Sequence, residues 1–243
     1  MPTLATVPRS AAAPPRALAS GPAGKVFTYH RSDYLASAPG AGEPQAFLVE
    51  MPEPGAVIPP HFHREDEFQV VVAGSGRLGV HALGGMAVHF ADAYTPYGPI
   101  RVGPAGLAFF TLRARADAGA EYMPESRARM ARKARRSVAA DVPPQGETAA
   151  LWPTHPDGLG AWIVRARPGE AVASPSGAGG RYYLIVSGSA ADGTTALPRW
   201  SCIWKPAGAR HPALEAGEHG TDVVVVQFPE DGAAERSGAG GYS

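Results

Sequence analysis

The sequence predicts an all-β protein made of two antiparallel β-barrels joined by a linker helix. Short apolar runs such as AFLVEM, EFQVVVAG and LAFFTLRA are separated by Gly and Pro, a pattern typical of antiparallel sandwiches and barrels. Helical periodicity is missing outside one segment. The strand pattern also occurs twice, because the second half of the chain repeats features of the first.

The order of segments follows from composition. Residues 1–24 are rich in Ala, Pro and Ser, so we expect a flexible arm there, or an arm that packs on a neighbouring subunit. The first barrel is expected over residues 25–118 and the linker helix over residues 119–142. The second barrel is expected over residues 143–232, and a flexible tail over residues 233–243.

The linker helix is expected from the segment EYMPESRARMARKARRSVAA, which runs from Glu121 to Ala140. Strong helix formers follow Pro124, and the Pro-Glu-Ser neighbourhood is a start signal. The basic side chains of this segment would suit a nucleic-acid patch. A solvated helix between two domains is the simpler interpretation.

Composition favours a protein that handles small molecules. The 22 Lys and Arg residues balance the 22 Asp and Glu residues, which gives no reason to expect nucleic acid or a membrane as partner. The longest apolar runs are strand-sized, far below the roughly 20 residues of a membrane helix. The single cysteine, Cys202, excludes an internal disulfide and is expected as a small buried hydrophobe. We therefore expect a cytoplasmic monomer or homodimer with a small-molecule substrate.

The internal repeat is clearest at glycines. Gly55 and Gly74 align with Gly169 and Gly188 at a constant offset of 114 residues, with QVVVAGS over YLIVSGS. A second match aligns PYG at 96–98 with PAG at 206–208 at an offset of 110, which implies a four-residue shortening. The repeat predicts two barrels of the same plan.

The segment GAVIPPHFHREDEFQVVVAG carries a predicted metal site. His61 and His63 are two residues apart, so on a strand both face the same side. The Arg-Glu-Asp stretch after them can turn the chain back, and the next strand then brings Glu67 to the same place. Imidazole and carboxylate ligands suit Fe, Mn, Ni or Zn, and we expect one such divalent ion per chain.

This segment also resembles the first motif of the cupin family, which is Gly, five residues, His-x-His, three residues, Glu, six residues and Gly. The resemblance covers roughly residues 25 to 232 and implies a bicupin with two jelly-roll barrels. Cupins close a second motif, Pro-x-Gly-x-x-His, with a fourth ligand, but here Arg101 occupies that position and His211 occupies it in the second copy.

The second copy lacks the ligands of the first motif. Pro175, Gly177 and Arg181 stand where His61, His63 and Glu67 stand in the first copy. The resemblance therefore assigns the metal site to the first barrel only, and His211 is interpreted as a relic that supports its loop.

Two roles are open for Arg101. It could bind an anionic substrate beside a metal, or it could pair with Glu67 in a site without metal. Gln69 and the tyrosines Tyr94 and Tyr97 are further candidates for substrate binding, each with a structural role as the alternative. His81 and His89 lie in the same barrel, and either could replace the missing ligand if the strand register allowed.

These observations predict a metal-dependent bicupin, a dioxygenase-type oxidoreductase acting on a small organic acid or phenolic substrate. The resemblance alone leaves the reaction open, because cupins include dioxygenases, isomerases, decarboxylases, lyases and plain binders. The alternative is a non-catalytic small-molecule-binding protein, with or without metal.

Overall fold

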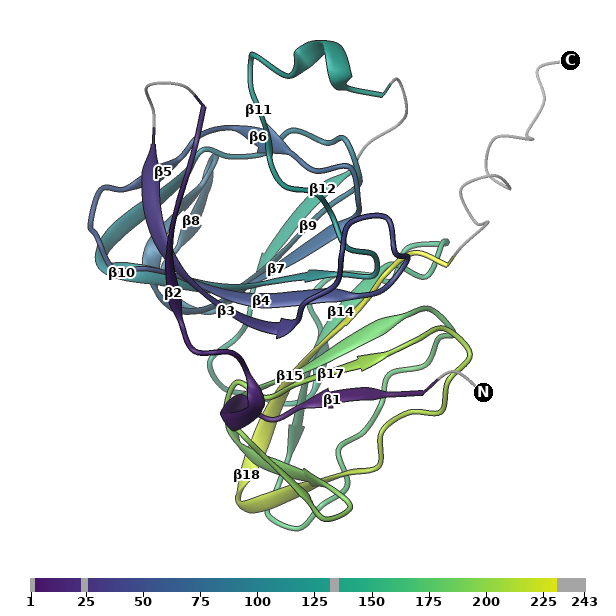
Figure 1. Ribbon diagram of the computed structural model, residues 1–243. Helices are drawn as coiled ribbons and strands as arrows, with labels where there is room; N and C mark the ends of the chain where they lie inside the picture. Colours follow the sequence, from purple (N-terminus) through teal and green to yellow (C-terminus); the bar gives the residue numbers. More distant parts are fainter. Residues whose placement is uncertain (1–2, 23–25, 132–135, 231–243) are drawn as a thin grey trace, which may run out of the picture. The chain divides into compact units, whose positions relative to one another are not determined.

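The computed structural model describes residues 3–22, 26–131 and 136–230 (Figure 1). Nearly all regular structure is antiparallel strand, which confirms the all-β class. The described residues form two compact units. The N-terminal unit comprises residues 12–145, and the C-terminal unit comprises residues 146–230 together with residues 3–11. No helix in the described residues is long and apolar enough to cross a membrane.

The N-terminal unit is built on a nine-stranded sheet with the order β12-β9-β7-β10-β4-β3-β2, to which β5 and β8 add by pairing with β10 and β7. A two-stranded sheet joins β6 and β11. The strands of this unit are β2 (Arg16–Ser20), β3 (Phe27–Leu35), β4 (Gln45–Met51), β5 (Val57–Ile58), β6 (His61–Phe62), β7 (Glu67–Leu78), β8 (His81–Leu83), β9 (Ala87–Ala91), β10 (Ile100–Arg113), β11 (Glu121–Tyr122) and β12 (Ser137–Asp141).

Strands of this unit curl around a common interior (Figure 1). Alternate residues of β4, β7 and β10 face it, because side chains on a strand alternate between its two sides. Phe47, Val71 and Phe109 belong to one buried apolar cluster there. Further along the same faces, Glu67 and Arg113 are polar and buried. The interior is therefore apolar at one end and polar at the other.

The C-terminal unit contains a seven-stranded sheet with the order β1-β17-β15-β18-β14-β13, to which β16 adds by pairing with β15. Its strands are β1 (Ala5–Val7), β13 (Ala149–Ala150), β14 (Gly160–Ala166), β15 (Arg181–Asp192), β16 (Thr195–Pro198), β17 (Cys202–Lys205) and β18 (Leu214–Gln227). Cys202 is buried, as expected for a small hydrophobe.

The two units repeat one strand plan. Strands β7 and β15 each have 12 residues, and β10 and β18 each have 14. In each pair, the second strand begins 114 residues after the first. The jelly-roll class fits these antiparallel sheets. The hydrogen bonds between the described strands do not close either sheet, however, so the strand pairing does not confirm two closed barrels.

A glycine contact recurs at the centre of the plan. Gly74 on β7 has φ 86° and Gly188 on β15 has φ 62°. A Cβ atom on Gly74 would lie 2.2 Å from the Gly106 carbonyl oxygen, and one on Gly188 would lie 2.1 Å from that of Gly220. Only glycine fits such an approach, which explains why the sequence repeat is clearest at these positions.

The expected arm is partly a pair of strands. β1 pairs with β17 and β2 pairs with β3, and a 3-10 turn, η1 (Arg9–Ala11), follows β1. Edge pairing uses backbone hydrogen bonds, which an Ala- and Pro-rich composition does not reveal. The expected tail over residues 233–243 lies outside the described residues.

The prediction of a linker helix is wrong, because the described residues of this segment do not form one. Between residues 119 and 142 they form β11, a 3-10 turn η2 (Arg127–Arg129) and β12, while residues 132–135 are not described. β12 pairs along its whole length with β9. Helix propensity is a weak local preference, and tertiary strand pairing overrides it.

Candidate functional site

Five residues selected from the sequence come together at the polar end of the N-terminal unit. His61 lies on β6 and His63 directly follows that strand, while Glu67 and Gln69 are alternate residues of β7. Tyr97 precedes β10, and its backbone pairs with that of His61 through hydrogen bonds of 3.0 and 3.1 Å. All five line one cavity of about 180 Å³.

His61 points its Nε2 atom into this cavity. Its Nδ1 lies 2.8 Å from the Pro59 carbonyl oxygen and its Nε2 lies 3.0 Å from the Tyr97 hydroxyl. Burial, together with the charge of His63, lowers the pKa of His61 to about 4. The ring is therefore neutral at neutral pH. Its Nδ1–H donates to the carbonyl, and its Nε2 carries a lone pair.

Tyr97 does not satisfy that lone pair. The single proton of its hydroxyl is directed at Glu67 Oε1, 2.5 Å away, and its oxygen accepts a hydrogen bond of 3.2 Å from Gln69 Nε2. Burial raises the pKa of Tyr97, and the neighbouring Glu67 charge raises it further. A lone pair in this position is what a metal ion or a substrate donor would meet.

His63 is oriented by a carboxylate. Its Nδ1 lies 2.9 Å from Asp117 Oδ1, and its Nε2 lies 3.7 Å from Glu67 Oε2. Asp117 is held in place by hydrogen bonds from the backbone N–H groups of Arg64 and Gly119. Burial alone would raise the pKa of Asp117, but the hydrogen bond from His63 and nearby positive charges hold it well below its usual range.

Arg113 is the cation that contacts Glu67. Its guanidinium forms a buried ion pair with Glu67 Oε2, donates to Gln45 Oε1, and lies 3.2 Å from His63 Nδ1. Burial would raise the pKa of Glu67, but the Arg113 charge, the two histidines and the Tyr97 hydrogen bond together outweigh it, and the pKa is lowered. Glu67 is therefore a carboxylate with both oxygens engaged, one by Arg113 and one by Tyr97.

Arg101 has neither of its predicted roles, because it is exposed on β10 opposite Val57 and Arg77. Its neighbours Ile100 and Val102 are the buried residues, and alternation turns Arg101 outward. The offset of 110 residues does not continue into the strand. In the common register Arg101 corresponds to Glu215 on β18, so His211 is not its counterpart.

Tyr94 also stands apart from the cavity, contrary to its predicted role. It lies in a turn with φ 64°, and its ring packs 5.9 Å from that of Phe62. The residues lining the cavity do not include Tyr94.

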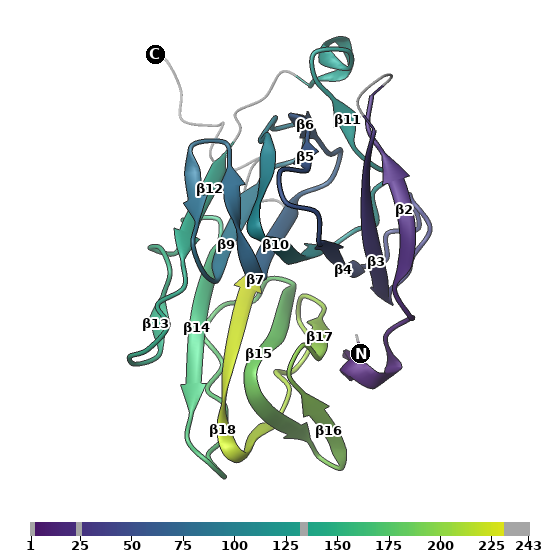
Figure 2. The same cartoon turned by 90° about the vertical axis from the view of Figure 1, so that its left-hand side faces the viewer.

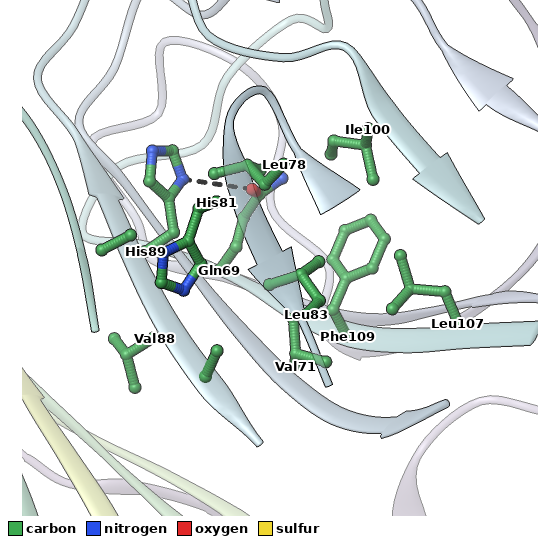
Figure 3. A pocket seen from close by; sticks show the side chains of 12 residues that line it. Gln69, Val71, Leu78, His81, Leu83, Val88, His89, Ile100, Leu107 and Phe109 are labelled. Atoms are coloured by element: carbon green, nitrogen blue, oxygen red, sulfur yellow. Dashed lines mark hydrogen bonds between the residues drawn. The ribbon is translucent and has the colours of Figure 1, made fainter. Parts of the chain in front are cut away.

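Figure 3 shows a narrow, mainly apolar cavity next to the site, where His89 and Gln69 face each other. His89 Nδ1 lies 3.2 Å from Gln69 Oε1, and its Nε2 lies 2.9 Å from Ser137 Oγ. His81 contacts Asp141 at 3.2 Å. Both histidines thus bond to other groups, and neither supplies a fourth ligand beside His61.

Sequence reasoning missed Arg113 and Asp117. Arg113 ends the run LAFFTLR, where Phe109, Thr111 and Arg113 are alternate residues on the face that lines the cavity. That alternation was the available signal. Asp117 follows β10 in a loop, and only the fold brings it to His63.

The site contains the imidazole and carboxylate groups of a metal centre, but its carboxylate, Glu67, is held in an ion pair with Arg113. Both histidines have Nδ1 held by an acceptor, as metal-bound histidines do. Yet among the described residues no three His, Cys, Asp or Glu side chains surround one metal position. The side chains fit a divalent cation only if Glu67 leaves Arg113.

One family model matches part of the chain. The family model described as Cupin matches residues 43–121, which include His61, His63, Glu67, Gln69, Tyr97, Arg113 and Asp117. No curated protein matches the chain.

Several solved structures resemble the chain. A putative dioxygenase from Nostoc punctiforme is 14% identical with a TM-score of 0.59, covering 84% of this chain and 76% of that one. A bacterial pirin from Escherichia coli in complex with nickel(II) is 11% identical with a TM-score of 0.56, covering 94% and 100%. A mutant of salicylate 1,2-dioxygenase from Pseudoaminobacter salicylatoxidans is 15% identical with a TM-score of 0.51, covering 79% and 72%. At these identities the likeness is one of fold.

Proposed function

Because residues 43–121 match the Cupin family model, we propose that the N-terminal unit is a metal-dependent site for dioxygenase-type oxidation of a small organic acid or phenolic compound. The observation that carries the proposal is the paired orientation of His61 and His63. Each ring has its Nδ1 fixed by an acceptor, and the Nε2 of His61 is turned toward Tyr97 while that of His63 is turned toward Glu67. Dioxygenases among the structures of similar fold support it.

His61, His63 and Glu67 would hold one divalent ion, with Fe, Mn, Ni and Zn all compatible with these ligands. A redox-active ion in this place would supply the electron transfer that oxygenation needs. Binding would have to break the ion pair between Glu67 and Arg113. A metal therefore competes with a resident guanidinium for one carboxylate.

Different residues of the cavity would bind different parts of the substrate. Arg113, once released by Glu67, presents a planar fork that suits a carboxylate. Tyr97 and Gln69 would orient polar groups of the substrate. Part of the remaining wall of the cavity is apolar and would take a ring or short chain, with Phe27, Tyr29, Phe47, Val49 and Phe109 on it.

The second candidate is a metal-free site that binds small molecules without catalysis. The observation in its favour is the same ion pair, which satisfies the charge of Glu67 without any metal. In that case Arg113 and Glu67 together would form a fixed polar wall of the cavity.

Metal content separates the two candidates. The proposal expects about one divalent transition metal per chain by elemental analysis, after purification without chelators and supplementation with each ion in turn. His63→Ala should lose the metal and His81→Ala, outside the ligand set, should keep it. A content near zero in the wild type would leave the metal-free binder.

A further inference from the structure

A cation replaces a carboxylate at one central position of the C-terminal unit. Arg181 on β15 stands at the position that Glu67 has on β7, and Lys205 on β17 stands at the position of Ala91 on β9. The register agrees, because Glu67 is paired with Ala91 and Arg181 with Lys205. β17, β15 and β18 are neighbours in one sheet (Figure 2).

The two cations are fully buried. Arg181 is 0% exposed and Lys205 is 1% exposed. The Arg181 Nε donates to Gln227 Oε1 at 2.7 Å and its Nη1 donates to the Pro175 carbonyl, but its Nη2 has no hydrogen-bond partner. The Lys205 ammonium donates to the Pro206 carbonyl at 3.2 Å.

None of the ion pairs within the described residues includes Arg181 or Lys205. Glu230 lies near enough to act on Arg181, but its Oε1 faces the backbone N–H of Ala178 at 3.3 Å. Burial lowers the pKa of Lys205, and the adjacent Arg181 charge lowers it further.

Adjacent buried cations with one unsatisfied donor favour the binding of a counter-charge, because burying an unpaired charge is costly. Cross-strand partners on one face have side chains a few ångströms apart, so one small anion can contact both. We propose that the C-terminal unit binds a small oxyanion, a phosphate or a carboxylate, between Arg181 and Lys205.

Further polar groups surround this position. The Tyr183 hydroxyl lies 2.7 Å from His211 Nδ1 and 3.3 Å from Ser174 Oγ. Ser174 and His211 belong to two loops, which are joined by a 3.4 Å hydrogen bond from Gly208 N–H to the Ala178 carbonyl. His211, a relic in the sequence interpretation, thus lies at the edge of the proposed anion site.

Thermal unfolding of the full chain tests the site. Wild-type protein is dialysed into an anion-poor buffer and titrated with inorganic phosphate or acetate, with chloride at matched ionic strength as reference. We expect one of the two oxyanions to raise Tm by about 2–4 °C over chloride. Phosphate alone would identify a phosphate site and acetate alone a carboxylate site. No rise over chloride with either one would overturn the proposal.

Variants tie the effect to the two cations. Lys205→Met should weaken oxyanion affinity, measured calorimetrically, by about tenfold or more. The matched control, Arg199→Met, removes an exposed cation of the same unit and should bind as the wild type does. In anion-free buffer Lys205→Met should also have the higher Tm, because it removes an uncompensated charge. Unchanged affinity in Lys205→Met would refute the site.

Discussion

The guanidinium of Arg113 and the carboxylate of Glu67 form an ion pair in which the two side chains are 4% and 2% exposed. The Nε2 of His63 points to Glu67, and the Nε2 of His61 points to Tyr97, which donates to Glu67. The ion pair is therefore both a structural element of the N-terminal unit and the group that any metal must displace.

The first prediction concerns the stability of this pair. Glu67→Gln or Arg113→Met alone leaves one buried charge without a partner and should lower the free energy of unfolding by about 3–5 kcal/mol. The double variant leaves no charge and should recover most of that loss. Urea denaturation of the four proteins measures the coupling. Losses that simply add would show that the two side chains do not depend on each other.

The second prediction concerns metal affinity. Arg113→Met removes the cation that competes for Glu67, so under the proposed function it should bind a divalent metal more tightly than the wild type. Arg101→Met removes an exposed cation of the same strand and should leave affinity unchanged. Competition with a metallochromic chelator measures both. Weaker binding in Arg113→Met would mean that Arg113 supports the ligands.

The third prediction concerns pH. Burial lowers the pKa of His89 to about 4 from an ordinary value of 6.5. The unfolded chain therefore takes up a proton between these values that the folded chain does not. Stability from His89 is complete above pH 6.5 and is lost as pH falls toward 4, by about 1 kcal/mol per pH unit.

Unfolding free energies at several pH values check this contribution. In His89→Gln the fall between pH 6.5 and 4 should be shallower than in the wild type by that amount. His81→Gln, which changes a less buried histidine, is the control. Identical slopes in His89→Gln and the wild type would show that His89 is protonated in the folded protein.

The fourth prediction concerns the glycine contact between β7 and β10. Gly74→Ala places a methyl group against the Gly106 carbonyl and also requires an unfavourable positive φ. The two costs together should destabilise the protein by about 2–5 kcal/mol. Gly84→Ala meets open space and should change stability by less than about 0.5 kcal/mol. Thermal unfolding compares them, and equal stabilities would contradict the close approach.

The sequence predicted what depends on local spacing. His61 and His63 share a side because they are two residues apart, and Glu67 and Gln69 return on the next strand for the same reason. The constant offset of 114 residues revealed the repeat. Gly74 and Gly188 mark it because each lies too close to the neighbouring strand for any side chain.

What failed depends on register and tertiary pairing. Arg101 was assigned to the site by its place in the second cupin motif, but on β10 its neighbours Ile100 and Val102 face inward and alternation turns Arg101 outward. Arg113 and Asp117 reach Glu67 and His63 from 46 and 54 positions away in sequence, so no local pattern joins them. β12 was predicted as helix because its amino-acid composition does not indicate that it pairs with β9.

The strand β1 has a practical consequence for dividing the chain. Its residues, Ala5–Val7, pair with β17 in the C-terminal unit, while β2 of the N-terminal unit follows soon after. A fragment beginning at residue 146 would lack this partner and would expose the backbone of β17 along an unprotected edge, a known route to aggregation. A single cut therefore yields no clean halves. To express the C-terminal unit separately, the first eleven residues must be supplied as well, either fused to its C-terminus or added as a separate peptide.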